Sequence, residues 1–496
     1  MDNQLNLLDS NNENSDSNQL SQTSDVLKNK IQGALVYSAV GDALGWPTEF
    51  GRYPSIVHKR FGKNYLTDYV EWEKVIGGRY WGYREKIKEG SYSDDTQLTL
   101  AVARCINGYG EFEADKFAYL ELPLWLNYER GGGKTIKTAA RIIVHSKKEW
   151  LLNFYKRGEI DYRYAGANGA AMRVLPIALV NVNNEKRLHT DAFKNAIITH
   201  GHPRAILGAM IYASAINYLL KESKFNKENF YNYIKEIVEL STASLKENDW
   251  VYKWTQEWDR NAVNGKFKEV FQQTRNEAKE YLEGMKRLLS VDDKEYYHLT
   301  RAFDEYKGSG ISTVFVAFYL FLKYLDNPED GIFKAVNMLG SDTDTIASFV
   351  GGLCGAYFGL SAINKDLISK LQDKDYILKI AEQLHDIITG RLLTNHIPIR
   401  DFNRKETLLK ILAWEIGLHE MFWDALSEGD QIIHPALGRG KIIRKEIKKI
   451  QREGYVTKLI EVAFDCGQTC IFHSRVSSNG EVSESLSKDL AKNITI

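Results

Sequence analysis

The chain has 496 residues and a formal net charge of zero, so nothing in its overall charge favours a nucleic-acid or membrane partner. An apolar content of 44% and only 8 prolines indicate a globular protein built mainly of helices. Four cysteines are too few for a disulfide framework. Residues 1–25 lack the basic and apolar regions of a signal peptide, and we expect a soluble, cytoplasmic protein.

The predicted elements begin after a polar tail. Residues 1–25 are rich in Asn, Ser, Gln and Asp, and we expect them to be disordered. Helical apolar spacing then predicts helices over 26–45, 96–106, 202–220, 275–289 and 344–360. We assign a helical domain to 26–400, a connecting helix to 401–427, and a small β module to 428–496, where short β-branched runs are broken by Gly, Pro, Asp and Asn.

Two acidic pairs stand at predicted helix starts. "SDDTQL" places Asp94 and Asp95 after Ser93, and "SDTDT" places Asp342 and Asp344 before Thr345. One carboxylate at a helix start is an ordinary cap. Four of them could share hard divalent cations if the two helix starts meet, because such cations prefer carboxylate and hydroxyl oxygens. The alternative is two unrelated surface caps.

Three further stretches carry chemistry only in context. "GDALGWPTEFG" breaks a helix and leaves Asp42 and Glu49 near Trp46. "GANGAAMRVLPIAL" is a small-residue loop whose backbone amides could approach a diphosphate, although a tight turn explains it equally well. "THGHP" puts His200 just before a helix, where a structural histidine is the ordinary interpretation.

Taken together and in this order, "GDALGWPTEF", "SDDTQL", "NGAAMRVLP", "THGHP" and "GSDTDTIASFVGGLCGAYFG" resemble the ADP-ribosylglycohydrolase family over about 30 to 370. The resemblance implies an all-α, orthogonal multi-helix bundle with two Mg²⁺ ions in a cleft. It implies metal ligands at Ser93, Asp94, Asp95, Asp342, Asp344 and Thr345. It implies substrate contacts at Asn168, Gly169, Ala170, Met172, Arg173, His200 and Ser341. Family members more usually have Thr at the position of Ser93 and Gly at that of Ser341.

The implied activity is magnesium-dependent hydrolysis of the bond between ADP-ribose and a modified acceptor, which reverses mono-ADP-ribosylation. Asp95 is our first candidate for the group that takes the proton of water, and Glu49 is the second. Arginine on a protein is the favoured acceptor, with serine or a nucleobase open. A non-catalytic reader of ADP-ribose is the alternative. An isoprenyl-diphosphate synthase would need D-D-x-x-D, where this chain has Leu98 at the fifth place.

The β module resembles the small SH3-like, Tudor-type barrels at the end of some DNA-repair helicases, through "EGDQIIHPALGRGKII" and "LIEVAFDCG" over about 428–475. Between Arg439 and Arg452 it has seven Lys or Arg residues against one acid, Glu446. Such a stretch could contact nucleic acid or an acidic protein face, and a solvated face of a hairpin is the alternative. We expect a monomer without membrane contact.

Overall fold

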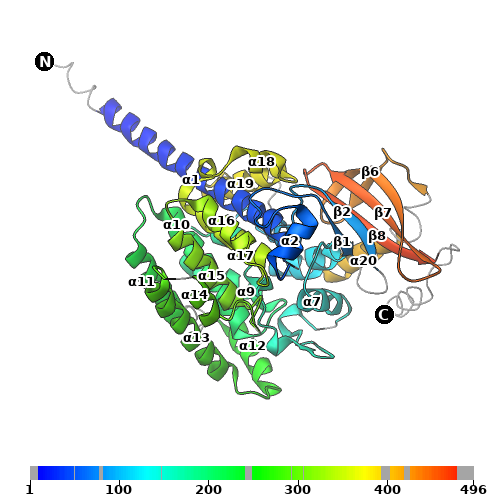
Figure 1. The fold of residues 1–496 in the computed structure, drawn as a ribbon, viewed down its shortest axis with the longest axis horizontal. Coiled ribbons are helices and arrows are strands. Elements are labelled where there is room, and N and C mark those ends of the chain that lie inside the picture. The colour runs from blue at the N-terminus through cyan, green and yellow to red at the C-terminus, as the bar shows by residue number, and fades with distance from the viewer. Residues whose placement is uncertain are drawn as a thin grey trace.

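The computed structural model describes residues 9–49, 51–76, 82–146, 148–240, 248–291, 293–304, 306–391, 403–417 and 425–477. Helices pack together over most of the chain, and a small sheet formed by the last strands lies at one side (Figure 1). This confirms the predicted all-α domain with a small β module. Among the described residues, no helix is both long and apolar enough to cross a membrane.

The elements follow one another with short connections. The helices are α1 (Asp9–Gly45), α2 (Pro54–Phe61), α4 (Asp94–Ala103), α5 (Ala114–Lys116), α6 (Leu122–Trp125), α7 (Lys134–His145), α8 (Leu175–Val180), α9 (Glu185–Ile197), α10 (Pro203–Lys221), α11 (Lys227–Leu240), α12 (Asp249–Arg260), α13 (Phe267–Leu288), α14 (Asp293–Leu299), α15 (Gly310–Lys323), α16 (Pro328–Val336), α17 (Thr343–Phe358), α18 (Lys365–Lys370), α19 (Lys374–Ile388) and α20 (Arg404–Ile416). The short turns η1 (Trp46–Thr48) and η5 (Asn168–Ala170) matter for the site. The strands are β1 (Trp72–Ile76), β2 (Tyr83–Ile87), β3 (Lys156–Arg157), β4 (Ile160–Asp161), β5 (Gln431–His434), β6 (Gly438–Lys449), β7 (Tyr455–Phe464) and β8 (Thr469–Ser477).

Helices α1 and α17 touch backbone to backbone at the centre of the helical domain. A Cβ atom added to Gly41 would lie 2.1 Å from the carbonyl oxygen of Ala347, and one added to Gly351 would lie 2.0 Å from that of Tyr37. Only glycine allows so close an approach. The helices run antiparallel, so the end of α1 lies beside the start of α17 and both deliver side chains to one place.

The helix starts follow the sequence rules. Ser93 caps α4, because its Oγ accepts a hydrogen bond from the backbone amide of Asp95 at 3.2 Å. Pro203 is the first residue of α10, which corresponds to the helix predicted over 202–220. Asp342 occupies the cap position of α17 but makes no side-chain cap bond. Its carboxylate therefore remains available for other partners.

The N-terminal tail differs from the expectation. The structure carries α1 back to Asp9, so residues 9–25, which we expected to be disordered, are helical and project from the body (Figure 1). A helix already nucleated by packing gains one hydrogen bond for each residue added, without a second nucleation cost. Residues 1–8 lie outside the described residues.

A hairpin interrupts the helical domain and was not predicted. Strands β1 and β2 pair antiparallel, with Trp72 opposite Ile87 and Lys74 opposite Glu85. Their alternating burial gives the hairpin one covered face and one exposed face. The pattern was available in "WEKVI" and "YREKI", but five residues are too few to separate a strand from a helical segment.

The C-terminal module is a four-stranded antiparallel sheet in the order β5-β6-β7-β8. In the part of the chain that the structure describes, β5 and β8 are its edges, so the expected closed barrel is not formed there. The sheet instead packs one face on the helical part: the His434 and Phe472 rings lie 4.7 and 5.2 Å from that of Trp414. Tyr128 approaches the same two rings at 6.2 and 5.8 Å.

Part of the basic stretch in β6 is engaged within the sheet. Arg444 pairs with Glu461 at 2.7 Å and with Glu446 at 2.9 Å. Lys448 also pairs with Glu446. These side chains are less available to a partner than the sequence indicates, and contact with nucleic acid stays a prediction.

Candidate functional site

A cavity of about 240 Å³ lies where the end of α1 and the starts of α4 and α17 converge. All five of the quoted sequence motifs contribute residues to it, together with residues 131–136 and 307–308. The lining residues are Glu49, Asp94, Asp95, Gly131, Gly133, Lys134, Thr135, Ile136, Ala167, Asn168, Gly169, Met172, His200, Lys307, Gly308, Asp342, Asp344 and Thr345. The two acidic pairs are therefore not unrelated surface caps.

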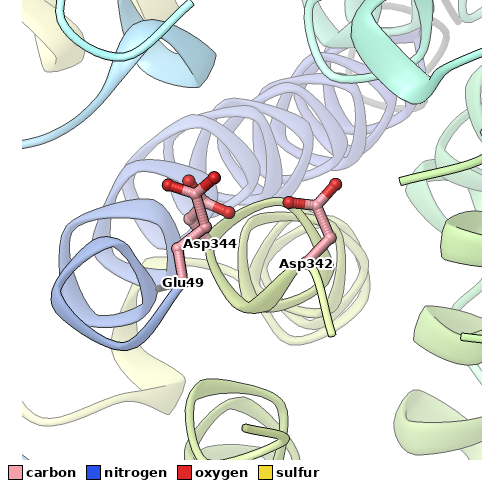
Figure 2. A group of neighbouring side chains, drawn as sticks. All are labelled: Glu49, Asp342 and Asp344. Carbon is pink, nitrogen blue, oxygen red and sulfur yellow. The ribbon is translucent and has the colours of Figure 1, made fainter. Parts of the chain in front are cut away.

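Three carboxylates form the centre of the cavity. Glu49, Asp342 and Asp344 each offer an oxygen atom within 4.8 Å of the others. In Figure 2 the carboxylates of Glu49 and Asp344 overlap in the view, and that of Asp342 lies to one side of them. Glu49 follows η1, whereas both aspartates belong to the start of α17, so the α1–α17 contact creates this cluster.

Asp94 and Asp95 extend the acidic cluster from α4. Burial raises the pKa of Asp94 well above its ordinary value, and the neighbouring carboxylates of Glu129 and Glu49 raise it further. Burial likewise raises the pKa of Asp95, with Asp42 and Asp94 adding to it. One oxygen of Asp95, Oδ1, is buried without a hydrogen-bond partner.

The pKa values of Glu49 and Asp344 are raised in the same way. Burial raises the pKa of Asp344 well above its ordinary value, and Glu49 is the strongest of the charges that add to it. Burial also raises the pKa of Glu49 to about 7, with Asp342 contributing. Several ionised carboxylates in so small a space are stable only with positive charge between them.

The donor set fits a divalent metal ion. All of its candidate ligands are oxygen atoms, which hard cations such as Mg²⁺, Ca²⁺ and Mn²⁺ prefer. An unpartnered Oδ1 on Asp95 and raised pKa values of the neighbouring aspartates are what carboxylates arranged around a cation show in its absence.

Asp42 supports the cluster from behind and was not predicted as a site residue. Its fully buried carboxylate accepts hydrogen bonds from the Ser93 amide at 3.1 Å and from the Thr96 amide and hydroxyl at 3.0 and 2.6 Å. These bonds tie α1 to the first turn of α4. Asp42 lies in the quoted motif "GDALG", but its role depends on a contact between two helices that spacing cannot show.

The small-residue loop forms the opposite wall. Asn168 donates a hydrogen bond from its side-chain Nδ2 to Asp342 Oδ2 at 2.7 Å. Its backbone N–H donates to the Gly308 carbonyl, also at 2.7 Å. A Cβ atom on Gly169 would lie 2.9 Å from His200 Cε1, so glycine is required beside that ring. Met172 lines the same wall.

His200 faces the cavity as a neutral imidazole. Burial, assisted by Arg173, lowers the pKa of His200 to about 3. Its Nδ1 lies 2.7 Å from Thr199 Oγ1, and its Nε2 is buried without a partner. In a neutral imidazole, a ring nitrogen without a partner can donate a hydrogen bond to a ligand or accept one from it, depending on the tautomer.

Arg173, a predicted substrate contact, is turned inward. It is fully buried and donates to Asn195 Oδ1 at 2.9 Å, to the Gly169 carbonyl at 2.9 Å and to Thr199 Oγ1 at 2.8 Å. Burial lowers its pKa to about 9. Its side chain shapes the loop from behind and does not line the cavity.

Three other predicted site residues also lie behind the cavity wall. Ser93 is fully buried and its hydroxyl caps α4. Ala170 is fully buried, and its carbonyl accepts from Asn195 at 3.0 Å. Ser341 is fully buried and donates to the Met338 carbonyl at 2.7 Å. Each holds the local backbone in place, whereas Glu49 and the remaining predicted residues line the cavity.

Lysines join the site without having been predicted. Lys307 lines the cavity and donates from Nζ to the Glu49 carbonyl at 3.3 Å. Lys134 follows a run of three glycines, "GGGK", which was the one available signal for this loop. Lys74 reaches the acidic cluster from β1.

A second cavity of about 320 Å³ adjoins the first and shares Thr135, Ala167, Lys307 and Gly308 with it. Arg204 lies in it with its guanidinium 4.1 Å from the centroid of the Tyr306 ring. The two cavities together offer an acidic end and a cationic, aromatic end.

Comparison with known proteins shows the family to which the chain belongs. The model of the family described as ADP-ribosylglycohydrolase matches residues 23–392. The chain belongs to this family. The match covers the helical domain and the acidic cluster and ends before the C-terminal sheet, which confirms the resemblance stated from the motifs.

Curated relatives in the ADP-ribosylglycohydrolase family are distant. The ADP-ribosylarginine hydrolase Tri1 of Serratia proteamaculans is 23% identical over 365 residues, 72% of this chain and 78% of the relative. The ADP-ribosyl-[dinitrogen reductase] glycohydrolase of Rhodospirillum rubrum is 28% identical over 189 residues, 38% of this chain and 57% of the relative. The ADP-ribosylhydrolase ARH3 of Gallus gallus is 24% identical over 327 residues, 61% of this chain and 79% of the relative. Membership supports a hydrolase.

Proposed function

We propose that this protein is a magnesium-dependent hydrolase that cleaves the glycosidic bond between ADP-ribose and an arginine side chain of a modified protein. The observation that carries the proposal is the acidic cluster, in which oxygens of Glu49, Asp342 and Asp344 lie within 4.8 Å of one another beside Asp94 and Asp95. Two magnesium ions are the expected complement.

The ligand set we propose is Asp94, Asp95, Asp342, Asp344 and Thr345, and Glu49 lies among these carboxylates as a candidate proton acceptor. When bound, magnesium supplies positive charge for the ribose hydroxyls and makes water at the site more acidic. Asn168 keeps Asp342 oriented through its 2.7 Å hydrogen bond. The hydroxyl of Ser93 is the weakest member of the predicted set, because it already caps α4.

The carboxylates have the chemistry that the reaction needs. Breaking the bond at the anomeric carbon develops positive charge on the distal ribose, and nearby carboxylates stabilise it. Asp95 and Glu49 remain the candidates to accept the proton of the attacking water. Without metal, burial and the neighbouring Asp342 raise the pKa of Glu49, and Asp95 has the unpartnered oxygen.

The second cavity supports the rest of the ligand. The shared Lys307 can pair with a diphosphate, and Arg204, which is held by Glu277 at 2.8 Å and lies over the Tyr306 ring, adds positive charge to this cavity. In this placement the distal ribose lies in the acidic cavity and the nucleotide extends toward Arg204.

Arginine is favoured as the acceptor because the relative that aligns over 72% of this chain is named an ADP-ribosylarginine hydrolase. The name of the ARH3 relative specifies no acceptor, which keeps other linkages open. The acceptor is therefore the part of the proposal that most needs direct measurement.

The test is release of free ADP-ribose, followed by mass spectrometry, from arginine-, serine- and DNA-linked mono-ADP-ribose with Mg²⁺ or EDTA. We expect Mg²⁺-dependent release from the arginine-linked substrate, and loss of release in Asp344→Asn. Glu280→Gln, on the exposed side of α13, is the matched control and should match the wild type. Tight binding of ADP-ribose without release from any substrate would contradict the proposal and favour the reader.

A further inference from the structure

One lysine of the β1–β2 hairpin stands on its covered face. The inward positions of β1 are Trp72, Lys74 and Ile76, and the outward positions are exposed. An amino group among inward apolar side chains is costly unless it meets opposite charge. Lys74 is the one lysine of the hairpin that points inward, whereas Lys86 of β2 is exposed.

The ammonium of Lys74 lies beside two indoles that contact each other edge to face, close to the acidic cluster. Its Nζ lies 4.6 Å from the centroid of the Trp46 ring and 5.8 Å from that of Trp72, and it is shielded from solvent. A Cβ atom on Gly131 would lie 3.2 Å from Lys74 Nζ and 3.0 Å from Asp94 Oδ1. The ammonium and a proposed metal ligand therefore flank the same point.

The charges around Lys74 are those of the proposed metal site. Burial lowers the pKa of Lys74, and Glu49, Asp94 and Asp344 act against this effect, with Glu129 adding to them. The carboxylates of the cluster repel one another. A lysine ammonium among them reduces this repulsion, as a bound divalent ion would.

The C-terminal sheet holds the hairpin in this position. Ile76 and Tyr83, at the far end of the hairpin, are buried against Leu459 of β7. Lys88 approaches Glu461 of β7 at 3.7 Å. In Figure 1 the strands β1 and β2 lie beside β6, β7 and β8, between the sheet and the helices.

The same covered face of the hairpin also contacts the helical domain. Glu85, opposite Lys74 in the register, forms a buried ion pair with Arg130. Tyr83 donates a hydrogen bond to Glu85 at 3.1 Å. The covered face of the hairpin is thus held at its far end by the sheet and in its middle by Arg130, and Lys74 stands between these two contacts.

We propose that Lys74 is a built-in counter-cation of the acidic cluster that competes with divalent ions, and that the C-terminal sheet keeps this competitor in place. The inference rests on the metal site of the proposed function. It assigns the sheet a role inside the enzyme: the sheet sets the affinity of the site for its metal.

The test measures Mn²⁺ binding without substrate, at low ionic strength, by the electron paramagnetic resonance signal of free Mn²⁺. Lys74→Met keeps the length of the side chain and removes its charge; Lys86→Met is the matched control on the exposed face of the same hairpin. We expect Lys74→Met to bind Mn²⁺ about tenfold more tightly, because a unit charge beside a divalent ion has at least this effect. Lys86→Met should not differ from the wild type.

The outcomes separate the two proposals. Equal or weaker Mn²⁺ binding by Lys74→Met, with binding intact in the wild type, overturns the counter-cation and leaves the hydrolase standing. No Mn²⁺ binding by either protein overturns both. Binding by Lys74→Met alone supports the inference, since the competitor then excludes the ion from the wild type.

A second variant tests the role of the sheet. Leu459→Ala removes the contact with Ile76 and Tyr83 at the far end of the hairpin. We expect it to tighten Mn²⁺ binding in the wild-type background and to change nothing in the Lys74→Met background, as for two changes that act through one group. Far-UV circular dichroism confirms that each variant is folded. An equal effect in both backgrounds, or none in the wild type, overturns the link between the sheet and Lys74.

Discussion

Glu49→Gln should stabilise the protein in the absence of divalent metal and should do so only at neutral to alkaline pH. Burial and the neighbouring Asp342 raise the pKa of Glu49 from 4.5 to about 7. The folded protein therefore holds a proton on this carboxyl that the unfolded chain has released. The stability that this proton contributes is complete below pH 4.5 and is lost as the pH rises through 7.

The magnitude follows from the two pKa values. Keeping Glu49 ionised in the folded state costs about 3 kcal/mol at pH 8, at 1.36 kcal/mol per pKa unit. Glutamine has nearly the same shape and no charge. We therefore expect its free energy of unfolding at pH 8 in EDTA to exceed that of the wild type by up to about 3 kcal/mol, a figure that already includes the attractions of Lys74 and Lys307 for the carboxylate.

Urea unfolding at pH 5 and pH 8, in EDTA and in Mg²⁺, checks this prediction. The gain should be present at pH 8 in EDTA, should largely vanish at pH 5, and should become a loss in Mg²⁺, where the carboxylate attracts the ion. Glu280→Gln on the exposed face of α13 controls for the loss of a charge. An Mg²⁺-independent result, or no gain at pH 8 in EDTA, would refute the reasoning.

Three further changes probe other parts of the structure. Asp344→Asn should reduce ADP-ribose release by at least about a hundredfold and weaken Mn²⁺ binding while the circular dichroism spectrum is retained; a normal turnover would contradict the site. Arg173→Ala should lower the free energy of unfolding by about 3 kcal/mol or more in urea, because it leaves several buried acceptors unpaired, whereas Arg157→Ala in the exposed strand β3 should change it by less than about 0.5 kcal/mol. Gly351→Ala places a methyl group 2.0 Å from the Tyr37 carbonyl and should leave little folded protein by size-exclusion chromatography; near-normal stability would contradict the backbone contact.

Each of the five ranges in which apolar spacing predicted a helix contains one in the structure. Ser93 and Pro203 act at helix starts through chemistry that lies within a few residues, and both stand where the pattern placed them. The meeting of Asp94 with Asp344, about 250 residues later, has no local signal. The order of the motifs, through the resemblance, supplied that pairing.

The direction of a side chain was less predictable than its position. Arg173 and His200 lie in neighbouring parts of the site, and both were assigned to the substrate. The structure turns the guanidinium inward to Asn195 and leaves Nε2 of the histidine facing the cavity. This choice depends on packing between separate segments, as does the entry of Lys74 from a hairpin that the sequence did not reveal.

The contact between α1 and α17 has a consequence for synthesis on the ribosome. The glycine face of α1, with Asp42 and Glu49 near its end, emerges early from the ribosome. About 300 further residues must be synthesised before Asp344 emerges. Until then α1 has no backbone partner at Gly41, and the carboxylates that create the site are apart. The emerging chain therefore acquires its metal-binding chemistry late and in one step, and a nascent chain halted before α17 would have no such site to load.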